Sequence, residues 1–569
     1  MTDLLARIKR VESRKVAIAL VVLFTTIGLG LRLRGLEREP LHVDEIMQVT
    51  DVQEPMGEIV RLSLEVQQPP LDYLIGKLVV TVAPATDFTQ RLPAALFGTG
   101  AIALVGLMLI RRSQLVAAAL AAWFLAISPM FVEFSQYARP YAIPVFFVVA
   151  TLAAYQHWHL GSKTRMTLAT FAVLVGLAFL SRATMPMVAL LALGLIATAR
   201  ALKTFSVSEP IRLIKSDPPA FIVLPAAVIV VWIPMFFALR ASGGRGFLAS
   251  CCVYDVWGRL SIGVDHAGTF GEQVVQPLSL LLLVIAAGGL ALVPAVRRAL
   301  GAAAFLWVPL LLTAPGFAMV HALTTRPGQF FARRYMVFLP VGFAVLFGIA
   351  LGAVTMAAWR RQPLIRFGTV ALVAVVVVQA SAPMLSAVES QYQNRDLADW
   401  RSTGEYVESI ERLGDVIVTI DTRPFQHEFR FGFVAADRYY NGISPQLTPN
   451  DVIADGSLSL EANRYHFVLF VPKMRGGWSV PSTWTTAEFE KMIILTTPDL
   501  MTHDARIDAW WTVSEQLRPE VAVRTQIAGA AVETATGTTL YPWSEVAVAE
   551  ATELGQGQLA VELLETATE

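Results

Sequence analysis

Residues 16–46, VAIALVVLFTTIGLGLRLRGLEREPLHVDEI, contain the pattern from which the fold can be predicted. They begin with an apolar run of about 20 residues, the length that a helix needs to cross a hydrocarbon core about 30 Å thick. Basic residues precede the run and no small-residue cleavage pattern follows it, so we expect a retained membrane helix over residues 16–36 rather than a removed signal peptide. Just beyond this helix stand two adjacent acids, Asp44 and Glu45.

The composition extends this expectation to the whole chain. Hydrophobic residues make up 55% of the 569 residues and charged residues only 16%. A soluble domain cannot bury that much apolar surface, so we expect a polytopic α-helical membrane protein with some soluble mass. The formal net charge is zero, which does not favour nucleic acid as a partner. Cys251 and Cys252 are neighbours, and adjacent cysteines bridge only with strain, so no disulfide framework is expected.

Apolar segments bounded by proline or glycine predict about 11 transmembrane helices, because within the membrane every backbone group must be bonded inside its own helix. The predicted segments are 16–36, 92–110, 114–132, 141–158, 167–183, 186–202, 219–239, 277–296, 302–320, 335–358 and 367–385.

The distribution of lysine and arginine predicts the orientation in the plasma membrane. If the N-terminus is cytoplasmic, every inside loop is basic, as the positive-inside rule requires. The extracytoplasmic side then receives residues 37–91, the turns near 133–140 and 181–182, the loops 240–276 and 321–334, and everything after about 386.

Two of the predicted extracytoplasmic segments should contain secondary structure. Within residues 37–91, the segments 56–66 and 71–82 have helical spacing and are too short or too amphipathic to span, so we expect interfacial helices. Residues 386–569 alternate predicted helices (399–413 and 424–440) with predicted strands (415–420 and 465–471), which favours a C-terminal α/β domain. This domain has no glycine-rich phosphate loop, so we do not expect it to bind a nucleotide.

The Asp44–Glu45 pair is the first candidate for chemistry. On an irregular segment the two side chains point in different directions, so one carboxylate can face a reacting centre as a general base while the other holds the backbone or a basic partner. The alternative is structural: Asp44 caps a helix that starts near Glu45.

Two further stretches on the same predicted side carry arginine and aromatic residues. They are 133–141 (EFSQYARPY) and 326–335 (RPGQFFARRY), and arginine is suited to holding phosphate through paired donors. The alternatives are an interfacial aromatic belt and a basic flank of a membrane helix. Arginines that break the positive-inside rule are either anion ligands or snorkelling side chains, and they are Arg32, Arg34, Arg38, Arg139, Arg182, Arg326, Arg333 and Arg334.

These stretches together resemble the GT-C class of membrane glycosyltransferases, and more closely its bacterial branch that is similar to dolichyl-phosphate-mannose–protein mannosyltransferases and aminoarabinose transferases. The resemblance covers about residues 16–385. It is carried by the early Asp-Glu pair and by the stretches 68–73 (QPPLDY), 91–96 (RLPAAL), 135–141 (SQYARPY) and 332–335 (ARRY) with Pro340 beyond.

The resemblance implies an extracytoplasmic active site and a polyprenyl-phosphate-linked sugar as donor. It implies that residues 1–385 form the catalytic domain, with Asp44 as the base beside Glu45. It also suggests Arg139 with Arg333 or Arg334 as ligands of the donor phosphate. Further candidates for substrate binding are Arg32, Gln68, Tyr137, Tyr141 and Arg182.

The implied reaction agrees with the residues. A lipid phosphate is a good leaving group, so one base for an acceptor hydroxyl and cations for the developing phosphate charge would suffice. A single displacement with inversion follows, through an oxocarbenium-like transition state. Arginines can take the place of a divalent metal, so no metal or other cofactor is expected. The acceptor can be a protein, a glycan or a lipid.

Two other classes of function remain alternatives. A transporter or lipid flippase usually places ionisable residues or broken helices at mid-membrane, whereas the charges here cluster at helix ends. A scaffold would use the C-terminal domain to bind a partner in the cell envelope.

Overall fold

The computed structural model describes residues 2–393 except 39, 42, 66–67, 205–209, 242–292, 325–335 and 360, and from the rest of the chain only Glu408, residues 438–443 and eight strands. The chain divides into two compact units. One comprises residues 1–36 and 51–393, and the other comprises residues 37–50 and 394–569. The predicted loops 240–276 and 321–334 lie almost wholly outside the described residues, as do both cysteines.

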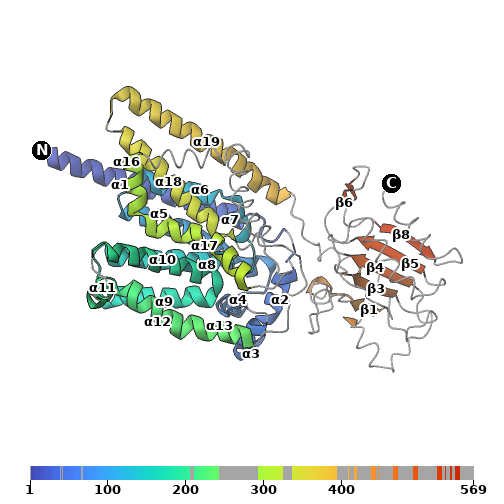
Figure 1. Ribbon diagram of the computed structural model, residues 1–569. Helices are drawn as coiled ribbons and strands as arrows, with labels where there is room; N and C mark the ends of the chain where they lie inside the picture. Colours follow the sequence, from blue (N-terminus) through green and yellow to red (C-terminus); the bar gives the residue numbers. More distant parts are fainter. Residues whose placement is uncertain are drawn as a thin grey trace. The chain divides into compact units, whose positions relative to one another are not determined.

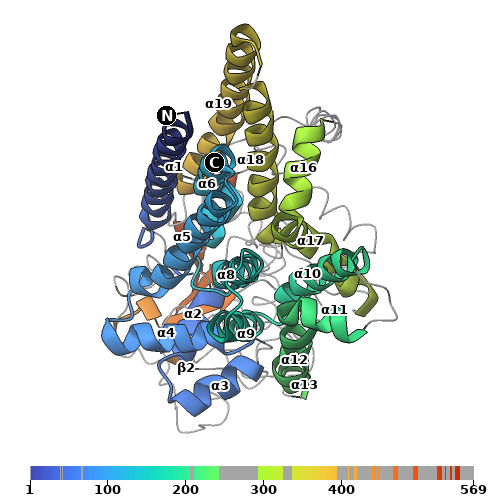
Figure 2. The ribbon, with the colours of Figure 1, turned by 90° about the vertical axis from the view of Figure 1, so that its left-hand side faces the viewer.

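The first unit is helical (Figure 1). Its long helices pack side by side: α5 against α8, α8 against α9, and α10 against α17. Figure 2, which looks nearly along α8 and α9, shows α5 on one side of this pair and α10 on the other. The helices are α1 (Thr2–Leu33), α2 (Val43–Asp51, whose last residue is in this unit), α3 (Met56–Glu65), α4 (Leu71–Val82), α5 (Asp87–Arg111), α6 (Leu115–Ala126), α7 (Pro129–Phe134), α8 (Ala142–His159), α9 (Arg165–Ser181), α10 (Thr184–Leu202), α11 (Pro210–Ser216), η1 (Pro219–Val223), α12 (Leu224–Ala227), η2 (Val228–Trp232), α13 (Ile233–Ala241), α16 (Pro294–Ala302), α17 (Ala304–Thr324), α18 (Phe338–Ala358) and α19 (Pro363–Gln393).

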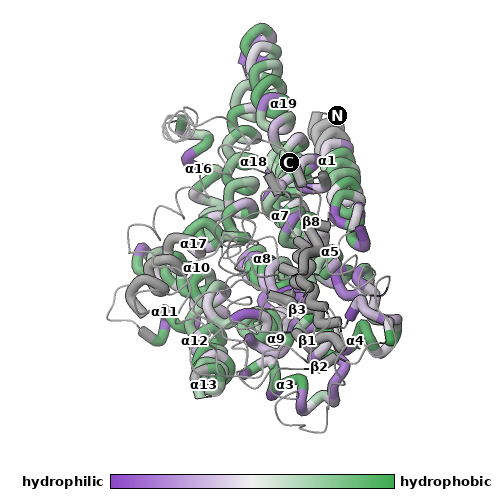
Figure 3. Tube along the Cα trace, turned by 90° about the vertical axis from the view of Figure 1, so that its right-hand side faces the viewer, coloured by the Kyte–Doolittle hydropathy of each residue, from purple (hydrophilic) through white to green (hydrophobic). Residues whose placement is uncertain are grey.

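Six of the described helical segments are long and apolar enough to cross a membrane, so the protein is a multi-pass helical membrane protein, as its composition predicts. Figure 3 shows hydrophobic residues along α18 and α19. Helices occupy the other predicted segments too, except 277–296, which lies almost wholly outside the described residues. The count of about 11 spans therefore stays a prediction. The six spans are Val11–Leu33, Asp87–Arg111, Thr184–Leu202, Pro219–Leu239, Phe338–Ala358 and Pro363–Tyr392.

The predicted span 114–132 is divided into two helices, α6 and α7. Pro129 stands at the start of α7, and a proline inside a continuous helix would remove a hydrogen bond and clash with the preceding turn. The helix α6 therefore ends at Ala126, and Ile127 and Ser128 separate it from α7. This break leaves carbonyl groups at the end of α6 that need partners.

Glycine allows α18 to approach α6 closely. A Cβ added at Gly348 would lie 2.7 Å from the carbonyl oxygen of Ala117, and one at Gly352 would lie 2.8 Å from the backbone nitrogen of Ala117. Two glycines four residues apart thus form the small-residue face that lets membrane helices pack with their backbones close together.

The segment after α1 is more regular than expected. The predicted helices 56–66 and 71–82 are confirmed as α3 and α4. The prediction that Asp44 and Glu45 stand on an irregular segment is wrong, and the alternative of a helix that starts near Glu45 is confirmed as α2, although Asp44 is the second residue of this helix rather than its cap. Adjacent positions of a helix are about 100° apart, so the two acids still occupy different faces of α2.

The second unit contains a six-stranded sheet in the order β2-β1-β3-β4-β5-β8 (Figure 1). The first five strands of this order are parallel, and β8 is antiparallel to β5. Strands predicted over 415–420 and 465–471 are confirmed as β1 and β3, whereas the predicted helices 399–413 and 424–440 lie almost wholly outside the described residues. The strands are β1 (Val416–Thr419), β2 (Gln446–Leu447), β3 (His466–Val471), β4 (Lys491–Thr496), β5 (Ala522–Ile527), β6 (Val532–Glu533), β7 (Thr539–Leu540) and β8 (Glu545–Glu550).

A hydrogen bond joins the two separate stretches of this unit. The backbone N–H of Leu41 donates to the hydroxyl of Tyr439 over 2.7 Å, across 398 positions of sequence. The segment that carries Asp44 and Glu45 is therefore bonded to the C-terminal part of the chain.

Candidate active site

Arg139 is the centre of a group of polar side chains in the first unit. It lies in the turn between α7 and α8, and its guanidinium is within hydrogen-bonding reach of the Tyr73 hydroxyl on α4. The carboxylate of Asp51, at the end of α2, interacts electrostatically with the same guanidinium. Three segments that are separate in sequence thus meet at one arginine.

Burial makes these interactions stronger than they would be in water. The side chains of Asp72 and Tyr73 are 3% and 1% exposed. Burial raises the pKa of Tyr73, and Arg139 acts in the opposite direction. Burial also raises the pKa of Asp51 to about 6, while Arg139 lowers it and the nearby Glu54 raises it further. Asp51 is therefore mostly ionised at pH 7 and can hold the Arg139 guanidinium.

The local sequence explains the position of α4 in this group. Pro69 and Pro70 precede α4, and proline favours the start of a helix because its missing N–H is not needed there. Asp72 falls in the first turn, where the helix dipole favours a negative charge. The same turn therefore carries Tyr73 to Arg139.

Aromatic residues and a second arginine surround the turn that holds Arg139. The rings of Tyr137 and Tyr141 lie 6.2 Å apart, and both contact Phe134. The guanidinium of Arg182 lies 5.3 Å from the Tyr141 ring and donates a hydrogen bond of 2.9 Å to the carbonyl of Pro140. The structure thus brings together three of the predicted substrate-binding residues, Tyr137, Tyr141 and Arg182.

Arg32 contacts backbone carbonyls and an aromatic ring inside the helical unit. It is fully buried, and its guanidinium donates to the carbonyls of Leu125 and Ala126 at the end of α6, each over 3.3 Å. It also lies 4.8 Å from the Phe131 ring. Arg32 therefore satisfies the carbonyls that the break before α7 leaves open, and its described contacts are with the protein. A contact with substrate stays a prediction.

The remaining predicted residues are less completely described. Asp44 lies seven residues before Asp51 in α2, so the two positions are two turns apart on one face of the helix. Glu45 is fully buried, and Gln68 is half-buried just before α4. Arg333 and Arg334 lie outside the described residues.

Asp51, Asp72 and Tyr73 were not predicted as site residues from the sequence. Asp72 and Tyr73 stand inside the stretch 68–73 on which the resemblance rests, directly after the two prolines and Leu71. The signal for Asp51 was its spacing of seven residues from Asp44, which would place both acids on one face of a helix. Within the described part of the chain, no three His, Cys, Asp or Glu side chains gather closely enough to hold a metal ion.

Part of the chain matches a known family in sequence. The family model of the dolichyl-phosphate-mannose-protein mannosyltransferases matches residues 67–214, about a quarter of the chain. This range includes Tyr73, Arg139 and Arg182, and the match confirms for this part of the chain the resemblance inferred from its motifs. No curated protein matches the chain in sequence.

Solved structures with a similar arrangement include two of ArnT from Cupriavidus metallidurans. The apo structure is 13% identical and has a TM-score of 0.49, covering 76% of this chain and 86% of that one. The structure bound to undecaprenyl phosphate is 12% identical and has a TM-score of 0.47, covering 78% and 91%. The oligosaccharyltransferase AglB from Archaeoglobus fulgidus, in complex with an inhibitory peptide and a dolichol-phosphate, is 14% identical with a TM-score of 0.44, covering 90% and 69%.

Proposed function

We propose that the protein is an integral-membrane glycosyltransferase that transfers a sugar from a polyprenyl-phosphate donor to an extracytoplasmic acceptor hydroxyl with inversion. One observation supports this proposal most directly. The range matched by the mannosyltransferase family model contains Arg139, whose guanidinium interacts with both Tyr73 and Asp51. A guanidinium held in place by a buried tyrosine and a half-buried carboxylate is suited to receive the charge that develops on a departing phosphate. A transporter or flippase is not favoured by the family match.

In this proposal Asp44 is the general base, and Glu45 supports it. Arg139 binds the donor phosphate together with Arg333 or Arg334. Gln68, Tyr137, Tyr141 and Arg182 contact the substrates. The phosphate leaves without protonation, so the reaction needs one base and cationic donors, and we expect no metal or other cofactor.

Several finer features belong to the same proposal. The chain would cross the plasma membrane about 11 times, with its N-terminus in the cytoplasm. Residues 1–385 would form the catalytic domain and residues 386–569 an extracytoplasmic α/β domain. The sugar would be a hexose or a pentose, and the acceptor a protein, a glycan or a lipid.

The test is a transfer assay with purified full-length protein, a polyprenyl-phosphate sugar and an acceptor. Asp44→Asn should lower kcat by about 10²–10⁴-fold, as loss of a general base does. Glu58→Gln is the matched control, since Glu58 lies on α3 and pairs with Arg61 at the surface. Full turnover by Asp44→Asn would exclude Asp44 as the base.

A second pair of variants tests the phosphate ligand. Arg139→Gln should raise the KM for the donor by more than about tenfold, because a hydrogen bond to a charged group contributes about 1.5–3 kcal/mol. Arg61→Gln should leave this KM unchanged. Activity that is lost in a chelator and restored by a divalent cation would contradict the expectation that no metal takes part.

A further inference from the structure

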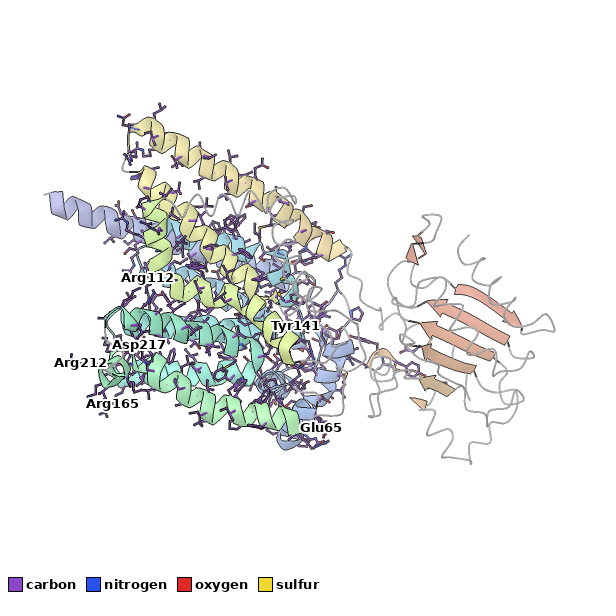
Figure 4. The ribbon with its side chains drawn as sticks, in the orientation of Figure 1. Glu65, Arg112, Tyr141, Arg165, Arg212 and Asp217 are labelled. Carbon is purple, nitrogen blue, oxygen red and sulfur yellow. The ribbon has the colours of Figure 1, made fainter. Side chains whose placement is uncertain are left out.

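The end of the helical unit away from Tyr141 carries many basic side chains. Figure 4 shows Tyr141 toward one end of this unit and Arg112, Arg165 and Asp217 toward the other. The helix α8 connects the two ends, and its 18 residues span about 27 Å at 1.5 Å per residue. Basic residues that lie at or next to helix ends of this side include Arg111, Arg112, Lys163, Arg165, Arg200, Lys203, Arg212, Lys215, Arg297, Arg298, Arg361 and Arg366.

One acid at this end, Asp217, is bound to other groups. Its Oδ2 atom accepts a hydrogen bond of 2.6 Å from the Tyr155 hydroxyl and lies 3.0 Å from Nε2 of His159. Its Oδ1 atom accepts from the backbone N–H of Ala220. Asp217 is only 6% exposed, and within the described part of the chain its ion pair is with His159 rather than with an arginine.

Two arginines from different helices converge on one aromatic ring at this end. The guanidinium of Arg112, just after α5, lies 4.5 Å from the centre of the Phe305 ring, and that of Arg200, in the last turn of α10, lies 5.8 Å from it. Phe305 is 1% exposed, so the ring fixes both cations against the interior. Arg112 also donates a hydrogen bond of 2.7 Å to the carbonyl of Ala302.

Both arginines keep unused donor capacity. The Nε atom of Arg112 is buried without a hydrogen-bond partner among the described residues. Among the same residues, the guanidinium of Arg200 makes a ring contact but no hydrogen bond or ion pair. Burial and the like charge of Arg200 lower the pKa of Arg112, so the two cations are close enough to repel each other.

The helix dipole favours a cation at the C-terminal end of each helix, which accounts for Arg112 after α5 and Arg200 in α10 separately. It does not account for both guanidinium groups contacting the same Phe305 ring. The two like charges repel each other, and in the part of the chain that the structure describes neither forms an ion pair with a carboxylate, so an anion that bridges them would relieve this repulsion. Arginine pairs in basic recesses between membrane helices suit phosphate groups, whose oxygens accept several N–H donors at once.

We propose that Arg112 and Arg200, placed on Phe305, form a second anion site that binds a phosphate group. The phosphate belongs either to the headgroup of an anionic lipid or to a free phosphate ion. The site is separate from the proposed active site and takes no part in the transfer reaction.

Thermal unfolding of the full-length protein in an uncharged detergent tests this proposal. One arm compares phosphatidylglycerol with phosphatidylcholine, and the other compares inorganic phosphate with chloride at equal ionic strength. At about ten times its dissociation constant, a bound ligand should raise the melting temperature of a protein of this size by about 1–2 °C. A rise with phosphatidylglycerol alone identifies the lipid headgroup, and an equal rise with inorganic phosphate identifies the free ion.

Variants separate this site from the general positive charge of the surface. R112Q/R200Q should lose the rise, whereas R297Q/R298Q, which removes two exposed charges from α16 at the same end, should keep it. Because R112Q also removes the bond to Ala302, the single variant R200Q serves as a second test, and native mass spectrometry should find less bound phosphatidylglycerol on the folded R200Q protein. Equal rises in wild type, R112Q/R200Q and R200Q, or no rise in wild type with either ligand, would overturn the proposal.

Discussion

The titration of Asp51 connects the stability of the protein with its proposed activity. Burial raises the pKa of this carboxyl from 3.8 to about 6, with Arg139 opposing the rise. The folded protein therefore holds the proton more tightly than the unfolded chain does. The resulting stability is fully present below pH 3.8 and is lost as the pH rises through about 6.

The size of the effect follows from the two pKa values. At about 1.36 kcal/mol per pH unit the difference corresponds to about 3 kcal/mol, and solvent screening of this half-buried carboxyl reduces it to about 1.5 kcal/mol. Asp51→Asn should therefore unfold at a higher temperature than wild type at about pH 7.5 and at the same temperature near pH 4.

Activity should change in the opposite direction. With a pKa of about 6, Asp51 is about 90% ionised at pH 7 and about 10% ionised at pH 5. If the ionised carboxylate holds Arg139 for the donor phosphate, the KM for the donor should rise about tenfold from pH 7 to pH 5 in wild type. Initial rates at low donor concentration between pH 5 and pH 8 measure this dependence.

The same measurement on Asp51→Asn decides the origin of the pH dependence. This variant should have a raised KM at pH 7 and should lack the transition near pH 6. A transition that keeps its midpoint near pH 6 in Asp51→Asn would belong to another group, and the reasoning about Asp51 would be refuted.

Two further substitutions test the packing around the candidate site. Arg32→Met should lower the free energy of unfolding by about 3 kcal/mol or more, because the carbonyls at the end of α6 lose the guanidinium that donates hydrogen bonds to them. An unchanged melting temperature together with an altered KM for the sugar donor would instead indicate that Arg32 contacts the substrate. Gly98→Ala should cost about 1–3 kcal/mol, since its Cβ would lie 2.8 Å from Cβ of Ser135, whereas Gly30→Ala, which meets nothing within 4 Å, should unfold at or above the wild-type temperature.

The long apolar helices could be predicted from the sequence because their signal is local. A run of apolar residues with proline or glycine at its ends defines a membrane helix without reference to the rest of the chain, and α9 and α10 begin and end close to the predicted residues. The helix α2 could be predicted only as an alternative, a helix that starts near Glu45, because its nine residues mix polar and apolar side chains in a segment too short to show a clear period.

The candidate site depends on contacts that no local pattern contains. Asp51, Tyr73 and Arg139 come from three separate segments, and their meeting is decided by helix packing rather than by spacing in the chain. Arg32 shows the same limit, because its partner carbonyl at Ala126 lies 94 positions away and is left open by the break before Pro129. From the sequence alone Arg32 could be interpreted as an anion ligand, a substrate-binding residue or a snorkelling side chain, but not as the partner of these carbonyls.

The hydrogen bond between Leu41 and Tyr439 has a consequence for biosynthesis. A ribosome adds about 5–20 residues each second, so roughly 20–80 s separate the emergence of these two partners. During that interval the backbone N–H of Leu41, close to Asp44, cannot yet form its hydrogen bond to the Tyr439 hydroxyl. A protein truncated before Tyr439 would never form this hydrogen bond. Removal of the C-terminal part would therefore also change the contacts of the segment that carries Asp44 and Glu45.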